Sequence, residues 1–498
     1  MKKVSYPQET TLTLSLPSFE NGLNTYLDEN LTNMQYAINL ENFSFSDGAL
    51  KNGIGFESFL DAICDSESLT TLKNSLSAIG SIVRVFHFYK YSQETNSRED
   101  KLILVNSSYS LYYINLFGEI GLNSLKNISF TSLPVAVRYR LNGEDVIILS
   151  SETDNMVVWD GVSDPYEVLD APKISSMALH YERLFATVDG EKNSVWFSDD
   201  LDPTNWSMSL DEAGFIELID ERGALLKVVS FLDYIYIFRE YGISRLTAYG
   251  DQASFSVSNL FVSSGKIYAN SVCVCGDKIL FLARDGLYRF DGVDTTKILS
   301  SLDNNLINVD NQNASACYFN GSYYLACKFK FMKDEDDCEN QNLSNALLEI
   351  DVVSGKLKNI THGVNISYIT TISIESVSGV IALAKQLTEN AFSLTILSKN
   401  ASFLQNKLKK VWQSPTTCLN NTGNKKTLKK IYLETKGDIS LFIIHGSKEI
   451  EYKFSGSILP QKKRVNIPIN NFTFRIESTD ENCKIQNLKF EFGSAKTY

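Results

Sequence analysis

The sequence predicts an all-β protein: a β-propeller with an N-terminal extended arm and a C-terminal antiparallel β-sandwich. Three observations predict it: a repeat of hairpin-like units, Asp-Gly turns, and a change of charge near residue 400. Each unit has two runs of β-branched and aromatic residues separated by polar residues, and the units recur roughly every 45 residues, the length of a propeller blade. Such a hairpin cannot bury its apolar faces alone, so neighbouring units must stack. The units begin near Leu102, Val146, Arg183, Tyr234, Lys278, Ser322 and Val380.

Residues 80–400 should therefore form six to eight blades, with seven as the favoured number. The first strand is expected over residues 82–91, ahead of the first repeat unit. Asp-Gly pairs are strong signals for hairpin turns, because glycine readily adopts positive φ. Four such pairs lie in the repeat region: Asp160-Gly161, Asp189-Gly190, Asp285-Gly286 and Asp291-Gly292. The acidic segment 333–342 is expected to be an exposed loop.

Residues 1–79 read as an N-terminal arm with short strands and one helix. Glycines interrupt the short apolar stretches of the first 60 residues, which is typical of extended structure. Residues 59–79 place leucine and isoleucine near helical spacing, so a helix is predicted there. If extended, residues 1–60 are long enough to reach an adjacent subunit.

The C-terminal hundred residues differ from the rest in charge and pattern. A polar linker over residues 401–430 is followed by six short alternating strands at roughly ten-residue spacing, which predicts a separate sandwich over 431–498. Residues 401–498 hold 17 Lys and Arg against 8 Asp and Glu, a balance of +9, whereas residues 1–400 hold 30 against 51, a balance of −21. This asymmetry fits either a solvated face or a basic domain that docks on the acidic part of a neighbouring copy.

Composition excludes several classes of protein. A net charge of −12 makes non-specific nucleic-acid binding unfavourable. The N-terminus lacks the apolar core of a secretory signal, and no window of 18 apolar residues predicts membrane insertion. Eight scattered cysteines do not form a disulfide scaffold. Cys273 and Cys275 should share one strand face, and the four histidines lie far apart in sequence, so we expect free thiols, no metal site and no cofactor.

Motifs for catalysis are missing from the sequence. It contains no G-x-S-x-G, no phosphate-binding G-x-x-x-x-G-K-[ST] and no H-E-x-x-H. The segment from Ser198 to Trp206 approaches a sialidase-type Asp box but lacks its glycine, and Glu349 and Asp351 fit either a carboxylate pair on one strand face or two solvated side chains. Arg183 fits either a solvent-facing residue or an ion pair between blades. We therefore predict that the protein is not an enzyme and name no catalytic, cofactor-binding or metal residue.

Three regions resemble the β-propeller proteins of bacteriophage tails and necks, in particular the tail nozzle (tail tubular B) type. Residues 19–25 (FENGLNT), followed by 37–42 and 48–55, resemble the family's N-terminal pattern, although Asn52 or Gly53 stands where an arginine is usual. Residues 181–206 resemble its R-L-F…D-P-x-x-W segment, and residues 281–292 (FLARDGLYRFDG) resemble one of its blades. Within that blade, either Leu287 and Phe290 or Tyr288 and Phe290 should pack between blades.

The resemblance implies a structural component of a virion, part of a tail or neck assembly around the DNA exit path. Its expected partners are copies of itself in a ring, most simply a homohexamer, and portal, neck-adaptor or other tail proteins. DNA would pass without specific binding, and assembly would take place in the host cytoplasm. Two alternatives remain open: a propeller that binds or cleaves glycans, and a cellular protein-interaction propeller.

Overall fold

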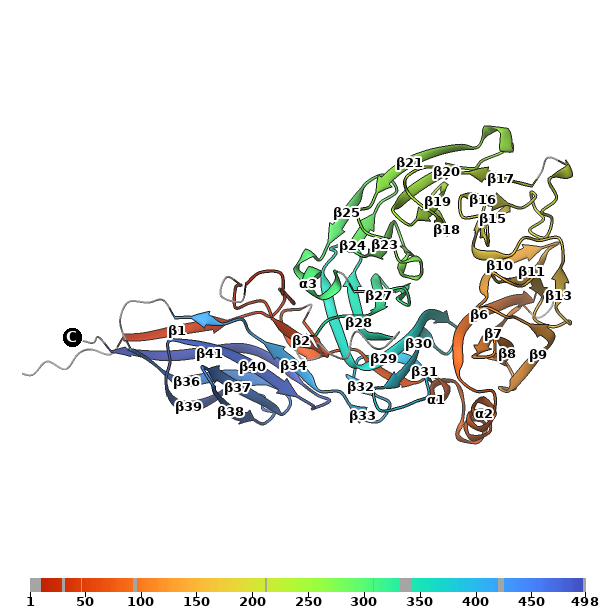
Figure 1. Ribbon diagram of the computed structural model, residues 1–498. Helices are drawn as coiled ribbons and strands as arrows, with labels where there is room; N and C mark the ends of the chain where they lie inside the picture. The colour runs from red at the N-terminus through yellow and green to blue at the C-terminus, as the bar shows by residue number, and fades with distance from the viewer. Residues whose placement is uncertain are drawn as a thin grey trace, which may run out of the picture.

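The computed structural model describes residues 10–28, 32–45, 47–92, 96–210, 213–307, 309–331, 343–419 and 425–495. It consists of a β-propeller joined to an elongated β-sandwich (Figure 1). The all-β prediction is confirmed: within the described ranges the α-helices are α1 (Phe59–Ile63), α2 (Ser66–Ala78) and α3 (Asp303–Leu306). The single helix predicted over 59–79 is divided at Cys64, because Asp65 accepts a hydrogen bond from the Ser68 amide (2.9 Å) and caps a new helix.

The propeller has seven blades in the part of the chain that the structure describes, the number that the repeat favoured. The first five are contiguous in sequence and each is a four-stranded antiparallel sheet. They are β6 (Ile82–Ser92), β7 (Ser97–Asn106), β8 (Ser110–Asn115) and β9 (Leu122–Ser129); β10 (Val135–Leu141), β11 (Glu144–Ser150), β12 (Met156–Trp159) and β13 (Tyr166–Val168); β14 (Ile174–His180), β15 (Arg183–Val188), β16 (Ser194–Phe197) and β17 (Gly214–Glu217); β18 (Leu225–Phe231), β19 (Tyr234–Arg239), β20 (Gly242–Thr247) and β21 (Ser256–Val262); β22 (Cys273–Cys275), β23 (Lys278–Ala283), β24 (Gly286–Phe290) and β25 (Thr295–Ile298).

The last two blades share one long strand, β29 (Leu357–Ser373). Its first half pairs with β28 (Ser344–Asp351) and completes blade 6 with β26 (Ser315–Phe319) and β27 (Ser322–Cys327). Its second half pairs with β30 (Ser378–Gln386) and opens blade 7, which continues with β31 (Ser393–Ser398). The acidic segment 333–342, expected to be an exposed loop, lies outside the described residues.

The repeat units found in the sequence coincide with one part of each blade. Every unit begins within the second strand of a blade, from β7 through β30. This strand lies between two others and is covered by both neighbouring blades, so it is almost wholly buried, as the pattern of β11 and β19 shows. The second strand therefore carries the strongest apolar signal, and each blade starts one strand earlier than the unit.

The fourth strand of blade 7 comes from the N-terminal region. It is β5 (Gly55–Ser58), which pairs antiparallel with β31, so residues more than 300 positions apart close the ring. Phe56 is fully buried there, and a Cβ on Gly55 would lie 2.0 Å from the Asn400 Oδ1. The tight packing indicates a fixed strand.

The rest of the N-terminal arm belongs to the sandwich of the same chain. β1 (Thr10–Leu16) and β4 (Leu50–Asn52) pair with β41 (Lys484–Ala495), and β2 (Asn39–Glu41) pairs with β34 (Lys410–Gln413). The short β3 (Phe43–Ser44) pairs with β29 of blade 6 and with β4. An arm that extends away from the chain is thus wrong for strands β1–β5, because these strands pair within the chain, and contact of this region with an adjacent subunit stays a prediction.

The six strands predicted for the sandwich are all present: β36 (Lys425–Thr435), β37 (Ile439–His445), β38 (Lys448–Phe454), β39 (Gln461–Pro468), β40 (Asn471–Ser478) and β41. One sheet pairs β41, β36 and β39 with β1 and β4, and the other has the order β2-β34-β40-β37-β38. Both β38 and β39 are edge strands in this pairing.

The linker predicted over 401–430 is wrong, because these residues contain β32 (Ser402–Phe403), β33 (Asn406–Lys407), β34, β35 (Thr417–Cys418) and the start of β36. Trp412 of β34 is fully buried, with its ring stacked on Phe474 (5.2 Å) and at right angles to Phe19 (5.2 Å). One continuous core runs from blades 5 and 6 through these residues into the sandwich. The sandwich is therefore not a separate unit as predicted.

Hydrogen bonds or polar contacts cross each of the seven seams between blades. They are Tyr91 N to Asp145 Oδ2 (3.0 Å), Tyr139 OH to the Glu182 carbonyl (3.1 Å), His180 Nδ1 to Ser230 Oγ (2.9 Å), Lys227 Nζ to the Val272 carbonyl (2.8 Å), Tyr323 OH to the Ser271 carbonyl (2.7 Å), Ile369 N to Ser315 Oγ (3.2 Å) and Arg98 Nη2 to the Ser373 carbonyl (2.6 Å). Each pair of neighbouring blades is therefore held together by at least one polar contact in addition to its apolar packing.

The turn and register predictions can now be checked. The glycines of all four Asp-Gly pairs have positive φ, from 77° to 136°, and each pair lies in a turn between strands. In blade 5, Tyr288 and Phe290 face blade 4, where their rings lie 5.7 Å from Phe261 and 5.1 Å from Tyr236. Leu287 faces the other side and joins the core shared with blade 6. The second of the two registers is therefore the observed one.

A carboxylate clamp joins blades 1 and 2. Asp154 accepts hydrogen bonds from the Thr131 amide (2.8 Å), Ser151 Oγ (2.6 Å) and Thr153 Oγ1 (2.8 Å). Burial alone would raise the pKa of Asp154, but these hydrogen bonds outweigh it and lower the pKa to about 2. The ionised carboxylate of Asp154, in the turn that follows β11, thus binds Thr131 in the link between blades 1 and 2.

We expect this clamp to fail in acid. A carboxyl whose pKa is lower in the folded state contributes stability above its unfolded pKa of about 3.9, and loses it as the pH falls through the folded value. Asp154→Asn should therefore lower the melting temperature at pH 7 and have little effect near pH 2. Differential scanning calorimetry across this range measures the difference, with Asp164→Asn at an exposed position as the control. A gap between wild type and Asp154→Asn that stays constant with pH would contradict the assignment.

Candidate functional site

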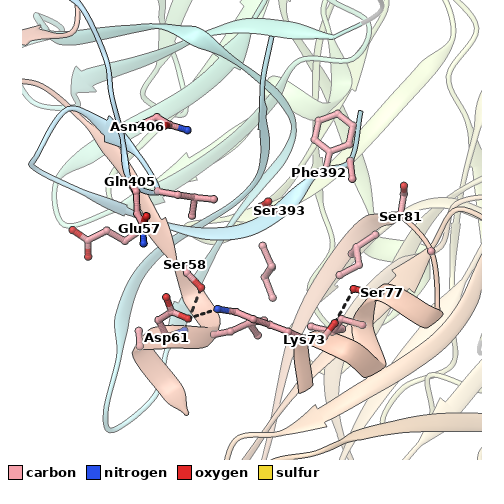
Figure 2. Close-up of a pocket in the computed structure, with 18 residues that line it drawn as sticks. Glu57, Ser58, Asp61, Lys73, Ser77, Ser81, Phe392, Ser393, Gln405 and Asn406 are labelled. Atoms are coloured by element: carbon pink, nitrogen blue, oxygen red, sulfur yellow. Dashed lines mark hydrogen bonds and ion pairs between the residues drawn. The ribbon is translucent and has the colours of Figure 1, made fainter. Parts of the chain in front are cut away.

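A broad hollow lies beside α1 and α2, where they approach the outer part of blade 7. It has a volume of about 1090 Å³ and is lined by α1, α2, the start of β31 and the turn at residues 404–406 (Figure 2). Its charged side chains are Glu57, Asp61 and Lys73. Figure 2 shows the Lys73 ammonium beside the Asp61 carboxylate, at 2.9 Å, and Glu57 accepts a hydrogen bond from Asn400 (2.8 Å).

This hollow does not assemble a catalytic group. Glu57, Asp61 and Lys73 are exposed, and each already has a polar partner in the chain. The lining residues include no histidine and no cysteine. General acid–base catalysis requires a side chain positioned on the reacting atom and shielded enough to tune its pKa.

The inner strands bring a second group of polar residues together. Lys227 on β18 donates to the Val272 carbonyl, and burial lowers the pKa of Lys227. Cys273 on β22 lies near this ammonium, and the pKa of its thiol is lowered by the contact with Cys275 and by Lys227. The same contact, together with burial, raises the pKa of the Cys275 thiol. Both cysteines are free and lie on one face of β22, as the sequence predicted.

The other candidates from the sequence have structural roles. Asp199, in the segment that approaches an Asp box, is buried and accepts from Asn205 Nδ2 (2.8 Å), while the buried Trp206 donates to the Pro203 carbonyl (3.0 Å). Arg183 is half-buried and donates to the Ser198 carbonyl of its own blade (3.0 Å). These contacts brace the turn between β16 and β17.

Glu349 and Asp351 have separate partners and do not act as a pair. Glu349 accepts from Ser322 Oγ (3.0 Å), and Asp351 forms an ion pair with Lys358 (2.8 Å). Burial alone would raise the pKa of Asp351, but the bonds from Lys358 and Ser354 lower it to about 2. No cluster of three His, Cys, Asp or Glu side chains suited to a metal ion occurs among the described residues. The helices that the structure describes are all too short or too polar to cross a membrane.

One group of residues was missed by the sequence analysis. In each of the first six blades, the turn between the first and second strands contains a residue with positive φ. It is Asn or Gly in four blades, namely Asn96, Asn142 with Gly143, Gly276, and Asn320 with Gly321, but Tyr181 in blade 3 and Leu232 in blade 4. Both of these side chains are exposed. A large apolar residue in a turn of this conformation is rare, and comparing equivalent turns between repeats would have identified it.

Comparison with known proteins gives fold-level similarity alone. No family model matches the chain, and no curated protein matches it either. A chain in the crystal structure of BBS1N in complex with ARL6DN, soaked with mercury, has a TM-score of 0.41 and 8% identity and covers 65% of this chain and 100% of that chain. The same complex soaked with lead gives a TM-score of 0.42 and 6% identity over 65% and 95% of the two chains. Similarity at this level carries no argument about function, and the propeller assignment rests on the strand pairing above.

Proposed function

We propose that the protein is a non-catalytic structural component of a bacteriophage virion, part of a tail or neck assembly around the DNA exit path. The observation that carries the proposal is the closure of the chain on itself. β5 completes blade 7, β1 and β2 complete the sandwich, and a single core joins the two bodies. An assembly part that transmits load benefits from this construction, because the N-terminal strands cover the edges of β31, β34 and β41.

Two further observations support the proposal. The three sequence regions that resemble tail nozzle proteins fall on the N-terminal segment, blade 3 and blade 5, all within the closed body. Residues 1–400 carry a balance of −21, and an acidic surface lets DNA pass without phosphate contacts. In this function the protein works as a ring of copies, most simply a homohexamer, bound to portal, neck-adaptor or other tail proteins.

The test is to locate the protein in particles of the phage that encodes it. Antibody labelling in electron micrographs should mark the tail or neck of every virion, and mass spectrometry of purified virions should detect the chain. Absence from the virion would overturn the proposal. The glycan-cleaving alternative predicts instead that the purified protein releases sugar from host polysaccharide, and that Glu57→Gln or Asp61→Asn in the hollow abolishes the release.

A further inference from the structure

The turns at one end of blades 3 and 4 carry a group of exposed apolar side chains. In each blade, the turn between strands one and two and the turn between strands three and four lie at the same end of the sheet, because neighbouring strands are antiparallel. We call the surface formed by these turns in blades 3 and 4 the turn face. Its exposed apolar residues are Tyr181, Leu201, Met208, Leu232 and Tyr249. Tyr181 of blade 3 contacts Tyr249 of blade 4, with ring centroids 5.7 Å apart, so the group is continuous across the seam.

The backbone of the turn face is unusual as well. Tyr181, Leu201 and Leu232 have φ values of 49°, 61° and 52°, in the left-handed region that large side chains avoid. Blades 2 and 6 place Asn142 and Asn320 at the positions of Tyr181 and Leu232. Folding alone would favour asparagine, so the apolar side chains at these turns indicate another use.

The rim of the turn face is acidic. Glu182, Asp200, Asp233 and Asp251 are exposed beside the apolar residues, on the same turns. An apolar patch with a charged rim of one sign is typical of a protein-binding surface whose partner carries the opposite charge.

A matching surface lies on the sandwich of the same chain. The turn between β38 and β39 ends in Ile458, which is 100% exposed, and Leu459, which is 72% exposed. Exposed Lys462 and Arg464 follow on the edge strand β39. We call this turn with the two cations the sandwich tip. The lysines of an edge strand also discourage strand pairing, but that role does not require a fully exposed Ile-Leu pair beside them.

Figure 1 shows the sandwich and blades 3 and 4 at opposite ends of the molecule, so the sandwich tip cannot reach the turn face of its own chain. We propose that the sandwich tip of one copy docks on the turn face of the next, with Ile458 and Leu459 against Tyr181 and Leu232 and the two cations against the acidic rim. This inference rests on the proposed function, since it names the surfaces that join copies in the ring. The contact is head-to-tail, and such contacts close into rings when the rotation between copies allows.

The test compares sedimentation of the full chain and its variants at low and high salt. Tyr181→Asn with Leu232→Asn copies the asparagines of blades 2 and 6, so it should fold at least as well as wild type and lose self-association. Ile458→Asp with Leu459→Asp should do the same from the other side of the contact. Leu169→Asp is the matched control and should assemble normally. Leu169 is 73% exposed and lies in the link from blade 2 to blade 3, on the opposite face of the propeller.

Charge reversal gives a second, independent readout. Lys462→Glu with Arg464→Glu should prevent assembly, and mixing this variant with Glu182→Lys/Asp233→Lys should restore an association that salt weakens. Wild type that assembles while both apolar double variants assemble equally well would overturn this inference and leave the proposed ring intact. If wild type stays monomeric at every concentration, or binds solely a different protein or a glycan, a second copy does not occupy the turn face and this inference is wrong. Detection of the protein in virions would still support the proposed function in that case.

Discussion

Deletion of residues 1–58 is expected to abolish cooperative folding of both the propeller and the sandwich. The deletion removes β5 from blade 7 and β1 and β2 from the sandwich sheets, and it leaves the edges of β31, β34 and β41 open. It also removes buried side chains from the core, among them Leu16, Phe19, Leu40, Phe43 and Phe56. Loss of a buried leucine or phenylalanine costs about 2–5 kcal/mol, and a typical domain is stable by roughly 5–15 kcal/mol, so the loss exceeds the total.

Circular dichroism with a thermal scan measures this result. The truncated chain should show no sharp transition, whereas Phe56→Ala alone should keep the transition and destabilise the protein by about 3–5 kcal/mol. An extended arm that served a neighbouring subunit would behave differently, because its deletion would weaken assembly and leave the melting temperature of the monomer unchanged. That outcome would contradict the closure described here.

Trp412→Ala is expected to be among the most destabilising single substitutions, at about 3–5 kcal/mol. The indole packs between Phe19 from the N-terminal segment and Phe474 from β40, at the point where three distant parts of the sequence meet. Trp196 provides the matched control, because it is half-buried and stacks on Phe215 at 5.4 Å near the surface of blade 3. Truncation there should cost less, since solvent can fill the space.

Urea denaturation of the two variants against wild type gives the comparison directly. The prediction includes a shift of the whole transition by Trp412→Ala, because the core is continuous from blades 5 and 6 into the sandwich. If the sandwich instead unfolded in a separate earlier step while the propeller transition stayed in place, the two bodies would be independent, as the sequence suggested.

The sequence predicted what depends on local pattern. Second strands such as β11 and β19 are apolar at nearly every position because blades cover both of their faces, so the repeat could be recognised and favoured seven blades within a range of six to eight. Most first strands were less visible, since residues such as Lys227 in β18 interrupt their apolar pattern. The six strands after residue 430 alternate because one face of each packs on the sandwich core.

Pairings between distant segments could not be predicted in this way. β5 is four residues long, and nothing in its composition specifies that it pairs with β31. β34 was read as linker because Lys410 precedes its Val-Trp pair, yet Lys410 is buried and donates to the Asp480 carbonyl (2.8 Å), and burial lowers its pKa. A polar residue of this kind is recognised as buried only when its partner, 70 positions away, is known.

The surfaces proposed for docking were equally hard to predict from the sequence. Tyr181 was named only as part of a segment that resembles the nozzle family, and Leu232 was not named. What sets both residues apart is the exposure of their side chains, whereas a single sequence suggests that an apolar residue belongs to the core. The asymmetry of charge suggested contact between copies, and the turn face and the sandwich tip are the surfaces that we propose for it.

Native mass spectrometry of the full-length protein at low salt tests the central claim most directly, namely that the chain is an assembly part that associates with copies of itself. The account predicts a closed species of fixed stoichiometry, with a mass equal to a whole number of 55.9-kDa chains and six as the expected number, which dissociates as salt is raised. A single 55.9-kDa species at every concentration and salt condition would contradict it.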